Sequence, residues 1–251
     1  MSRSRRRERL APLITILAFF ALWEFGTRLL DVPVFILPKP TDIVASMQRW
    51  WSPLQMHALH TLMTTVAGFA ISIVLGSVLG LVVGYSKTAH QALYPLLIGF
   101  NSVPKVALVP ILIIWFGLGT IPAIITACLI SFFPILVNVA TGLATVPQEL
   151  EDVLRSLGAR KSELFIKVGL PSSMPYFFAS LKVSVTLAFV GSIISETVAS
   201  NRGIGYLMIA ASGRFDVPLV FAGLFVIAVM GILLYEGFAF LERKLTAWAY
   251  R

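Results

Sequence analysis

The sequence has few charged residues, and this scarcity excludes an ordinary soluble domain. Asp, Glu, Lys and Arg together make up 13% of the 251 residues, whereas a soluble domain carries about 25%. Hydrophobic residues reach 57% and the mean hydropathy is +0.87. Because so little polar surface is available to face water, we expect an integral membrane protein.

Groups that carry chemistry are also scarce. Cys128 stands alone, which excludes a disulfide within the chain and predicts a buried structural thiol. His57 and His60 offer two metal ligands without a third. The chain has no GxxxxGK[ST] phosphate loop, and Gly203-Ile-Gly205 lacks the third glycine and the strand of a dinucleotide site. We therefore expect no cofactor and no metal in this chain. The apolar runs also lack the paired acids or metal motif that an intramembrane enzyme would need.

Long apolar runs are abundant. A helix needs about 20 such residues to cross a hydrocarbon core about 30 Å thick, with its backbone satisfied internally. The runs are too long and too weakly alternating for barrel strands, which need about 9–11 residues. We expect an all-α polytopic membrane protein with six transmembrane helices, at Ala11–Leu30, His60–Tyr85, Ala92–Phe116, Thr120–Leu143, Met174–Ala199 and Pro218–Leu241.

The basic residues indicate the orientation. With the N-terminus inside, most of the 20 Lys and Arg residues fall in cytoplasmic segments, so both termini are predicted to be cytoplasmic. The chain then divides into a basic N-terminus, residues 1–10, and a single transmembrane domain, residues 11–251, in which the loop 145–171 is cytoplasmic. The net charge of the chain is +8. Its basic residues lie beside the ends of the predicted membrane helices, which favours anionic lipid and not nucleic acid as their partner. We interpret the Arg-rich start as the flank of an uncleaved first helix.

Small residues recur every four positions in the second span. Such a row forms one groove along a helix and is typical of close helix packing. Its members are Gly68, Ser72, Gly76, Gly80 and Gly84.

Prolines interrupt the third span. Pro95, Pro104 and Pro110 surround Lys105, and such interruption is tolerated where protein covers the backbone or a cavity adjoins it. Lys105 either attracts an anionic solute or pairs with a neighbour, and we favour the second role.

Polar side chains within the spans are candidates for a solute path. Glu196 either shapes an outer gate with the Asn201–Tyr206 turn or makes a structural pair with Arg202. Further candidates for the solute path are Ser131, Asn138, Ser184, Thr186 and Ser192. The alternative role of these residues is hydrogen bonding between helices.

Residues 145–171 form a charged island between apolar runs, and we name it the docking loop. Thr145 and Gln148 make a capping box, Gly158 ends the helix in a left-handed turn, and a second short helix ends before Leu170-Pro171. Helical spacing places one apolar face at Leu150, Val153, Leu154 and Leu157. By itself the pattern fits equally a helix that binds a soluble partner and one that lies on lipid.

The docking loop resembles the cytoplasmic loop signature of binding-protein-dependent ABC transporter permeases. That signature is Glu-Ala-Ala, three residues, Gly, nine residues, an aliphatic residue, any residue, then Leu-Pro. Asp152-Val153-Leu154 occupies the first positions, so the two alanines are replaced, while Gly158, Val168 and Leu170-Pro171 match. The segments LPKPTDI, VPKVALVPILIIWFGLG and ISETVASNRGIGYLM resemble the branch that imports nitrate, taurine, alkanesulfonates and related small solutes.

The resemblance implies a type I importer permease of the bacterial inner membrane that has no enzyme activity of its own. It implies two ATPase subunits that bind ATP and Mg²⁺, a second permease copy in a homodimer, and an extracytoplasmic binding protein that delivers the solute. The residues assigned to ATPase docking are Glu149, Glu151, Asp152, Val153, Leu154, Arg155, Ser156, Leu157, Gly158 and Ala159, and the end of the signature is Phe165, Val168, Leu170 and Pro171.

Two other classes of transport protein remain alternatives from the residues alone. A secondary transporter would normally carry an inverted repeat, and a channel would carry a filter or a charged ring. The sequence shows no clear sign of either.

Overall fold

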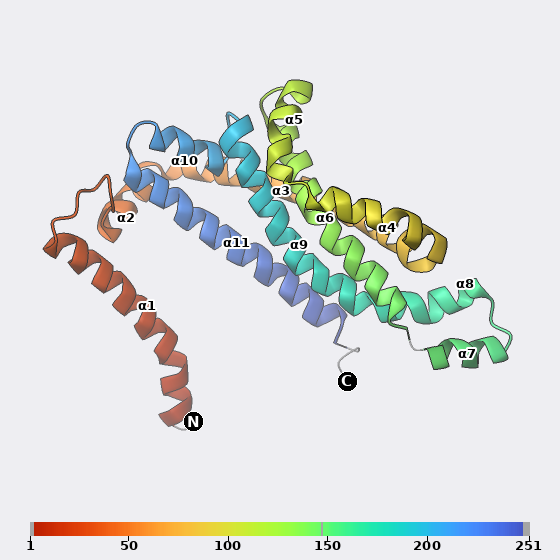
Figure 1. Cartoon of the computed structure of the whole chain (residues 1–251). Helices are drawn as coiled ribbons and strands as arrows, with labels where there is room; N and C mark the ends of the chain where they lie inside the picture. The colour runs from red at the N-terminus through yellow and green to blue at the C-terminus, as the bar shows by residue number, and fades with distance from the viewer. Residues whose placement is uncertain (1–2, 147, 248–251) are drawn as a thin grey trace.

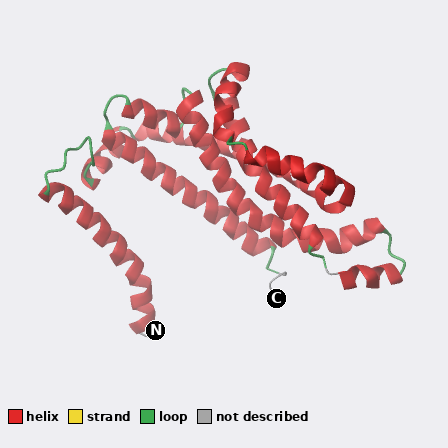
Figure 2. Ribbon diagram, viewed as in Figure 1, coloured by secondary structure: helices red, strands yellow, loops and turns green. Residues whose placement is uncertain are grey.

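The computed structural model describes residues 3–146 and 148–247, and this part of the chain consists of helices joined by short turns, with no strand (Figure 2). The α-helices are α1 Arg3–Leu29, α2 Pro40–Arg49, α3 Trp51–Tyr85, α4 Lys87–Ser102, α5 Val109–Phe116, α6 Thr120–Ala144, α7 Gln148–Ser156, α8 Lys161–Leu164, α9 Leu170–Ala199, α10 Ile204–Ser212 and α11 Val217–Leu245. A 3₁₀ turn, η1 (Lys105–Leu108), precedes α5, and a π-helical turn, η2 (Phe165–Gly169), precedes α9.

Three long helices, α3, α6 and α9, pack side by side and form the centre of the bundle (Figure 1). Their buried apolar side chains are Phe69, Ala127, Ile135, Val139, Phe178, Leu181, Val185 and Ala188. A second cluster joins α2, the start of α3, α10 and the start of α11; it consists of Ile43, Leu54, Ile204, Leu207, Ala211, Leu219 and Ala222. The second cluster holds the short helices α2 and α10 against one end of the bundle.

The small-residue row of α3 lies directly against the backbone of α6. A Cβ atom added at Gly76 would stand 2.7 Å from the Phe132 carbonyl oxygen, and one at Gly80 would stand 2.8 Å from that of Leu136. At Gly68 the nearest carbonyl oxygen, that of Ile124, would be 2.6 Å away. These distances are too short for any side chain, so glycine is what allows the two helices to approach.

The third predicted span is a bent pair of helices instead of one straight helix. Between α4 and the η1–α5 segment the chain turns by 80°. Pro104, at the break, has no backbone N–H with which to continue the helix. The prolines of this segment therefore mark a real interruption, although the expected single range, residues 92–116, did not include the bend.

The fifth span begins earlier than expected. The predicted break before Leu170-Pro171 is wrong, because α8, η2 and α9 follow one another without a turn and the helix from Phe165 to Ala199 is continuous over 35 residues. Pro171 lies in the first turn of α9, next to the π-helical turn η2, and proline is tolerated in the first turn of a helix.

Thr145 ends α6 instead of capping α7. Its backbone N–H donates to Thr141 O (2.9 Å) and its hydroxyl donates to Gly142 O (3.2 Å). The predicted capping box is therefore wrong at its first residue; Pro147 and the side chain of Gln148 lie outside the described residues.

The second span also begins earlier than residue 60, because α3 starts at Trp51, directly after α2. Four helices of the described part are long and apolar enough to cross a membrane, and the bent pair makes a fifth crossing if it counts as one. The first predicted span lies in α1, which leans away from the bundle toward its N-terminus (Figure 1). Trp23 in α1 contacts Phe221 and Phe225 of α11. The count of six spans and the orientation stay predictions.

We expect Gly76→Ala to destabilise the bundle. The added methyl group overlaps Phe132 O and Ile135, and overpacking of this kind costs about 1–3 kcal/mol. Gly237→Ala in α11 is the matched control, because no atom lies within 4 Å of its added Cβ and alanine is the better helix former by about 1 kcal/mol. Thermal unfolding of the detergent-purified protein measures both. Equal midpoints for the two variants would contradict close α3–α6 packing.

Candidate functional site

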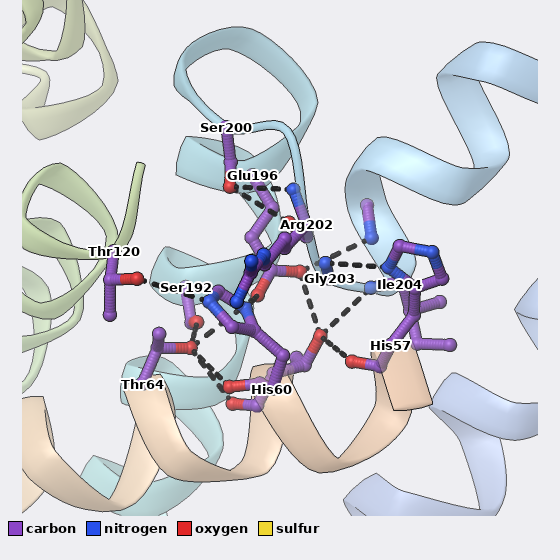
Figure 3. A network of polar contacts seen from close by, with 12 residues as sticks. His57, His60, Thr64, Thr120, Ser192, Glu196, Ser200, Arg202, Gly203 and Ile204 are labelled. Carbon is purple, nitrogen blue, oxygen red and sulfur yellow. Dashed lines mark hydrogen bonds and ion pairs between the residues drawn. The ribbon is translucent and has the colours of Figure 1, made fainter. Parts of the chain in front are cut away.

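At the end of the bundle where α10 packs on α3, the carboxylate of Glu196 is fully buried (Figure 3). Thr61 Oγ1 donates to Glu196 Oε2 (2.8 Å), and the backbone N–H of Gly205 donates to the same oxygen (3.2 Å). Thr64 Oγ1 stands 3.4 Å from Oε1, and His60 Nδ1 stands 3.5 Å from it. We call this group of side chains and amides the outer network, after the predicted orientation of the chain. It supplies the donors that a carboxylate away from water requires.

The turn before α10 passes directly over the carboxylate. Gly203 has φ +101°, a left-handed conformation that favours glycine, and a Cβ there would overlap the Glu196 carboxyl group. A Cβ at Gly205 would stand 2.6 Å from Ile193 O. The two glycines of Gly203-Ile-Gly205, which the sequence excluded from nucleotide binding, therefore allow the turn to lie on Glu196.

Three successive amides at the start of α10 are satisfied by side chains. The N–H of Gly203 donates to His57 Nδ1 (3.0 Å), that of Ile204 to Thr61 Oγ1 (2.9 Å) and that of Gly205 to Glu196. A helix N-terminus has unpaired donors and carries partial positive charge, which favours an anion beside it. Glu196 thus holds α10 in place by the same contacts that satisfy its own buried oxygens.

The outer network extends to the start of α6. His60 Nε2 lies 3.1 Å from Thr120 Oγ1, and the backbone N–H of Gly119 donates to Ala199 O (2.8 Å). Thr64 and Ser192 share a hydrogen bond of 2.5 Å between their hydroxyls. Helices α3, α6, α9 and α10 therefore meet at one polar site within an apolar bundle.

One of the two roles expected for Glu196 was a structural pair with Arg202. The contacts found for its carboxyl group are instead with α3 and α10. The Arg202 residue is exposed, and its backbone N–H donates to Ser200 Oγ (3.1 Å). The basic nitrogen found beside Glu196 among the described residues is His60 Nδ1, which carries a charge only when the imidazole is protonated.

Of the other predicted path residues, Ser192 belongs to the outer network and the rest lie elsewhere. Ser131 Oγ donates to Ala127 O (2.7 Å) and Asn138 Nδ2 donates to Pro134 O (2.8 Å), so both bond within α6. Lys105 is 9% exposed and donates to the Asn101 backbone oxygen and to Asn101 Oδ1 (2.9 Å). Its ammonium therefore has a neighbour as partner, as we favoured.

The docking loop lies at the opposite end of α9. Gly158 has φ +83°, its N–H donates to Arg155 O (2.9 Å), and the N–H of Ala159 donates to Leu154 O (3.0 Å). This is the predicted left-handed helix end. Val153 and Leu157 are 57% and 77% exposed; the side chains of Leu150 and Glu151 lie outside the described residues.

The end of the signature anchors the docking loop to the bundle. Leu164 is buried, and the ring of Phe165 packs edge-on against Tyr85 at the end of α3, with centroids 5.4 Å apart. Val168 and Leu170 are half-buried, Pro171 opens α9, and Gly169 has Leu143 of α6 as a neighbour. Glu149, Asp152, Arg155 and Ser156 are exposed on α7.

Sequence reasoning missed several partners. His57, Thr61 and Thr64 lie at positions i, i+4 and i+7 of α3, so one polar stripe in an otherwise apolar helix was the available signal. Lys182 on α9 pairs with Glu242 on α11 at 2.5 Å. Glu24 pairs with Arg28 and also accepts from the Thr41 backbone N–H (3.1 Å), which ties α1 to α2.

The chain is similar to known transport proteins over nearly its whole length. It is 34% identical over 245 residues to the formylaminopyrimidine transport permease of Halalkalibacterium halodurans, covering 97% of this chain and 98% of the relative. It is 33% identical to the riboflavin transport system permease of Chloroflexus aurantiacus, covering 94% and 88%. It is 30% identical to the aliphatic sulfonates transport permease assigned in Bacillus subtilis, covering 91% and 83%.

The fold is that of a solved ABC transporter subunit. An inward-facing structure of the MetNI methionine ABC transporter matches with a TM-score of 0.66 at 17% identity, over 78% of this chain and 97% of the other. The family model of the binding-protein-dependent transport system inner membrane component matches residues 72–247. The chain therefore belongs to this family of multi-pass inner-membrane permeases.

Proposed function

We propose that this chain is the membrane-spanning subunit of an ATP-driven importer and passes a small solute, delivered by an extracytoplasmic binding protein, into the cytoplasm. The observation that carries the proposal is the docking loop, where α7 stands away from the bundle (Figure 1) and exposes Val153 and Leu157. Large apolar side chains exposed on a charged helix are typical of a surface that a partner protein covers. The proposed partner is a separate ATPase subunit, which binds ATP and Mg²⁺.

Helix α9 gives the proposed ATPase contact a route to the outer network. Its continuous stretch from Phe165 to Ala199 has 35 residues, which corresponds to about 50 Å of helix. Phe165 lies near the end of the docking loop, and Glu196 lies in the last turn of α9. A displacement that reaches Phe165 at the end of the docking loop would therefore be carried to Glu196 along one continuous helix. We propose that this linkage opens and closes an outer gate formed by Glu196 and the Asn201–Tyr206 turn.

We further propose a homodimer, because a pair of ATPase subunits presents two docking surfaces and one chain has one docking loop. For the solute, we propose a sulfonate, taurine, nitrate or a related small organic molecule. Similarity to permeases for sulfonates and for formylaminopyrimidine supports this range without selecting within it. Ligand screening of the associated binding protein would identify the solute.

Breaking the turn at Gly158 is expected to release the ATPase subunit. Valine is β-branched and is disfavoured at φ +83° by about 1–2 kcal/mol or more, so Gly158→Val should reduce ATPase co-purification at least fivefold and abolish ATP-dependent uptake. Gly158→Asn is the control, since asparagine tolerates the left-handed conformation. Full co-purification with the valine variant in correctly folded protein, or uptake that persists without any ATPase, would refute the docking assignment.

Glu196→Gln should impair transport while leaving the permease assembled. The amide keeps the shape of the side chain but replaces one carboxyl oxygen by an NH₂ donor, which disturbs the hydrogen bonds accepted from Thr61 and Gly205, each worth about 0.5–1.5 kcal/mol. We expect solute uptake in vesicles to fall at least fivefold. Glu236→Gln, at an exposed position of α11, serves as the control. Unimpaired uptake with unchanged solute preference would overturn the gate role of Glu196.

A further inference from the structure

A cleft of about 760 Å³ separates the docking loop from the bundle. It lies where α3 ends, α4 begins and α6 ends, and the docking loop forms its remaining wall. Figure 1 shows α4, α7 and α8 at the same end of the molecule. The volume falls within the range of about 300–1,000 Å³ that is usual for small-molecule sites.

The floor of the cleft is apolar. Val83 is 1% exposed, and Ala140 and Leu164 are also buried, so this surface belongs to the packed interior of three helices. Phe165 and Tyr85, whose rings contact each other, continue the floor toward the docking loop. A ligand that fills the cleft must therefore bring apolar surface with it.

The rim of the cleft is basic. Lys87 and His90 lie in the first turns of α4, and Arg155 projects from α7 on the other side. The His90 ring stacks on Tyr94, with centroids 4.7 Å apart. None of the described residues that line the cleft is acidic. Positive groups on two separate elements thus face a common space, which favours an anion between them.

We propose that this cleft binds an anionic phospholipid from the cytoplasmic leaflet, with the phosphodiester at Lys87 and Arg155 and the start of an acyl chain on the floor. Basic pockets at the cytoplasmic ends of membrane helices recognise lipid head groups in this manner. A free phosphate anion shares the head-group chemistry but gains nothing from the apolar floor. The lipid would bridge α4 and α7 and so set the position of the docking loop.

The inference depends on the proposed function for its orientation, which places the docking loop on the cytoplasmic side. Its test does not read transport, so the two can fail separately. The full-length permease is purified in neutral detergent, stripped of lipid, and titrated with phosphatidylglycerol or phosphatidylcholine of the same acyl chains. Native mass spectrometry measures the bound lipid.

We expect one saturable phosphatidylglycerol molecule per chain with clear preference over phosphatidylcholine. In the double variant Lys87→Gln/Arg155→Gln the affinity should fall about 25-fold, which corresponds to about 1 kcal/mol for each cation removed. The matched control is Arg243→Gln/Lys244→Gln, which removes the same charge from exposed positions at the end of α11 and should leave the affinity unchanged.

A second variant tests the floor without altering charge. Ala144→Phe adds bulk at an exposed position that lines the cleft, so it should weaken phosphatidylglycerol binding at least fivefold. Glycerol 3-phosphate, which lacks acyl chains, is titrated in parallel and should bind far more weakly than the lipid.

Three outcomes would overturn the proposal. Equal binding of the two lipids, or equal losses in the double variant and its control, would show that no such site exists. Glycerol 3-phosphate binding as tightly as the lipid would assign the cleft to a soluble phosphate. Loss of the bound lipid when the ATPase subunit is added would assign the cleft to the protein interface.

Discussion

The buried carboxylate of Glu196 is the constraint on which the outer half of the protein depends. A charged side chain at membrane depth costs several kcal/mol unless donors surround it. The chain supplies them from Thr61 on α3 and from the N-terminal amides of α10, whose own need for acceptors is met in return. One buried carboxyl group thereby links the position of α10, the left-handed conformation of Gly203 and the polar face of α3.

The docking loop presents the opposite case, because apolar contacts hold its end while α7 exposes both polar and apolar side chains. Leu164 and Phe165 fix the end of the loop to α3, while α7 carries Val153 and Leu157 outward. Since one continuous helix runs from Phe165 to Ala199, the proposed ATPase contact and the proposed outer gate lie at its two ends. The basic cleft beside α7 adds a proposed point at which the surrounding bilayer contacts the docking loop.

The sequence allowed the local features to be predicted, and the distant pairings had to come from the structure. The fourth span, 120–143, agrees with α6 to one residue, because a long apolar run fixes its own ends at polar or glycine positions. The left-handed turn at Gly158 was predictable, since glycine after a helical pattern is a local signal. Thr61 and Glu196 are 135 residues apart, and nothing in one sequence shows that two such residues meet. The 80° bend and the continuous α8–α9 helix were missed because proline indicates an interruption without giving its angle or excluding a π-helical turn.

The glycine row on α3 also restricts how this protein can change shape. Where Gly68, Gly76 and Gly80 stand against carbonyl oxygens of α6, the two helices have no side-chain layer that could rearrange as they slide. We therefore expect α3 and α6 to move together as one rigid pair. The alternating access proposed for this protein would therefore have to leave the α3–α6 pair intact and move other elements around it, such as the segment bent by 80° at Pro104.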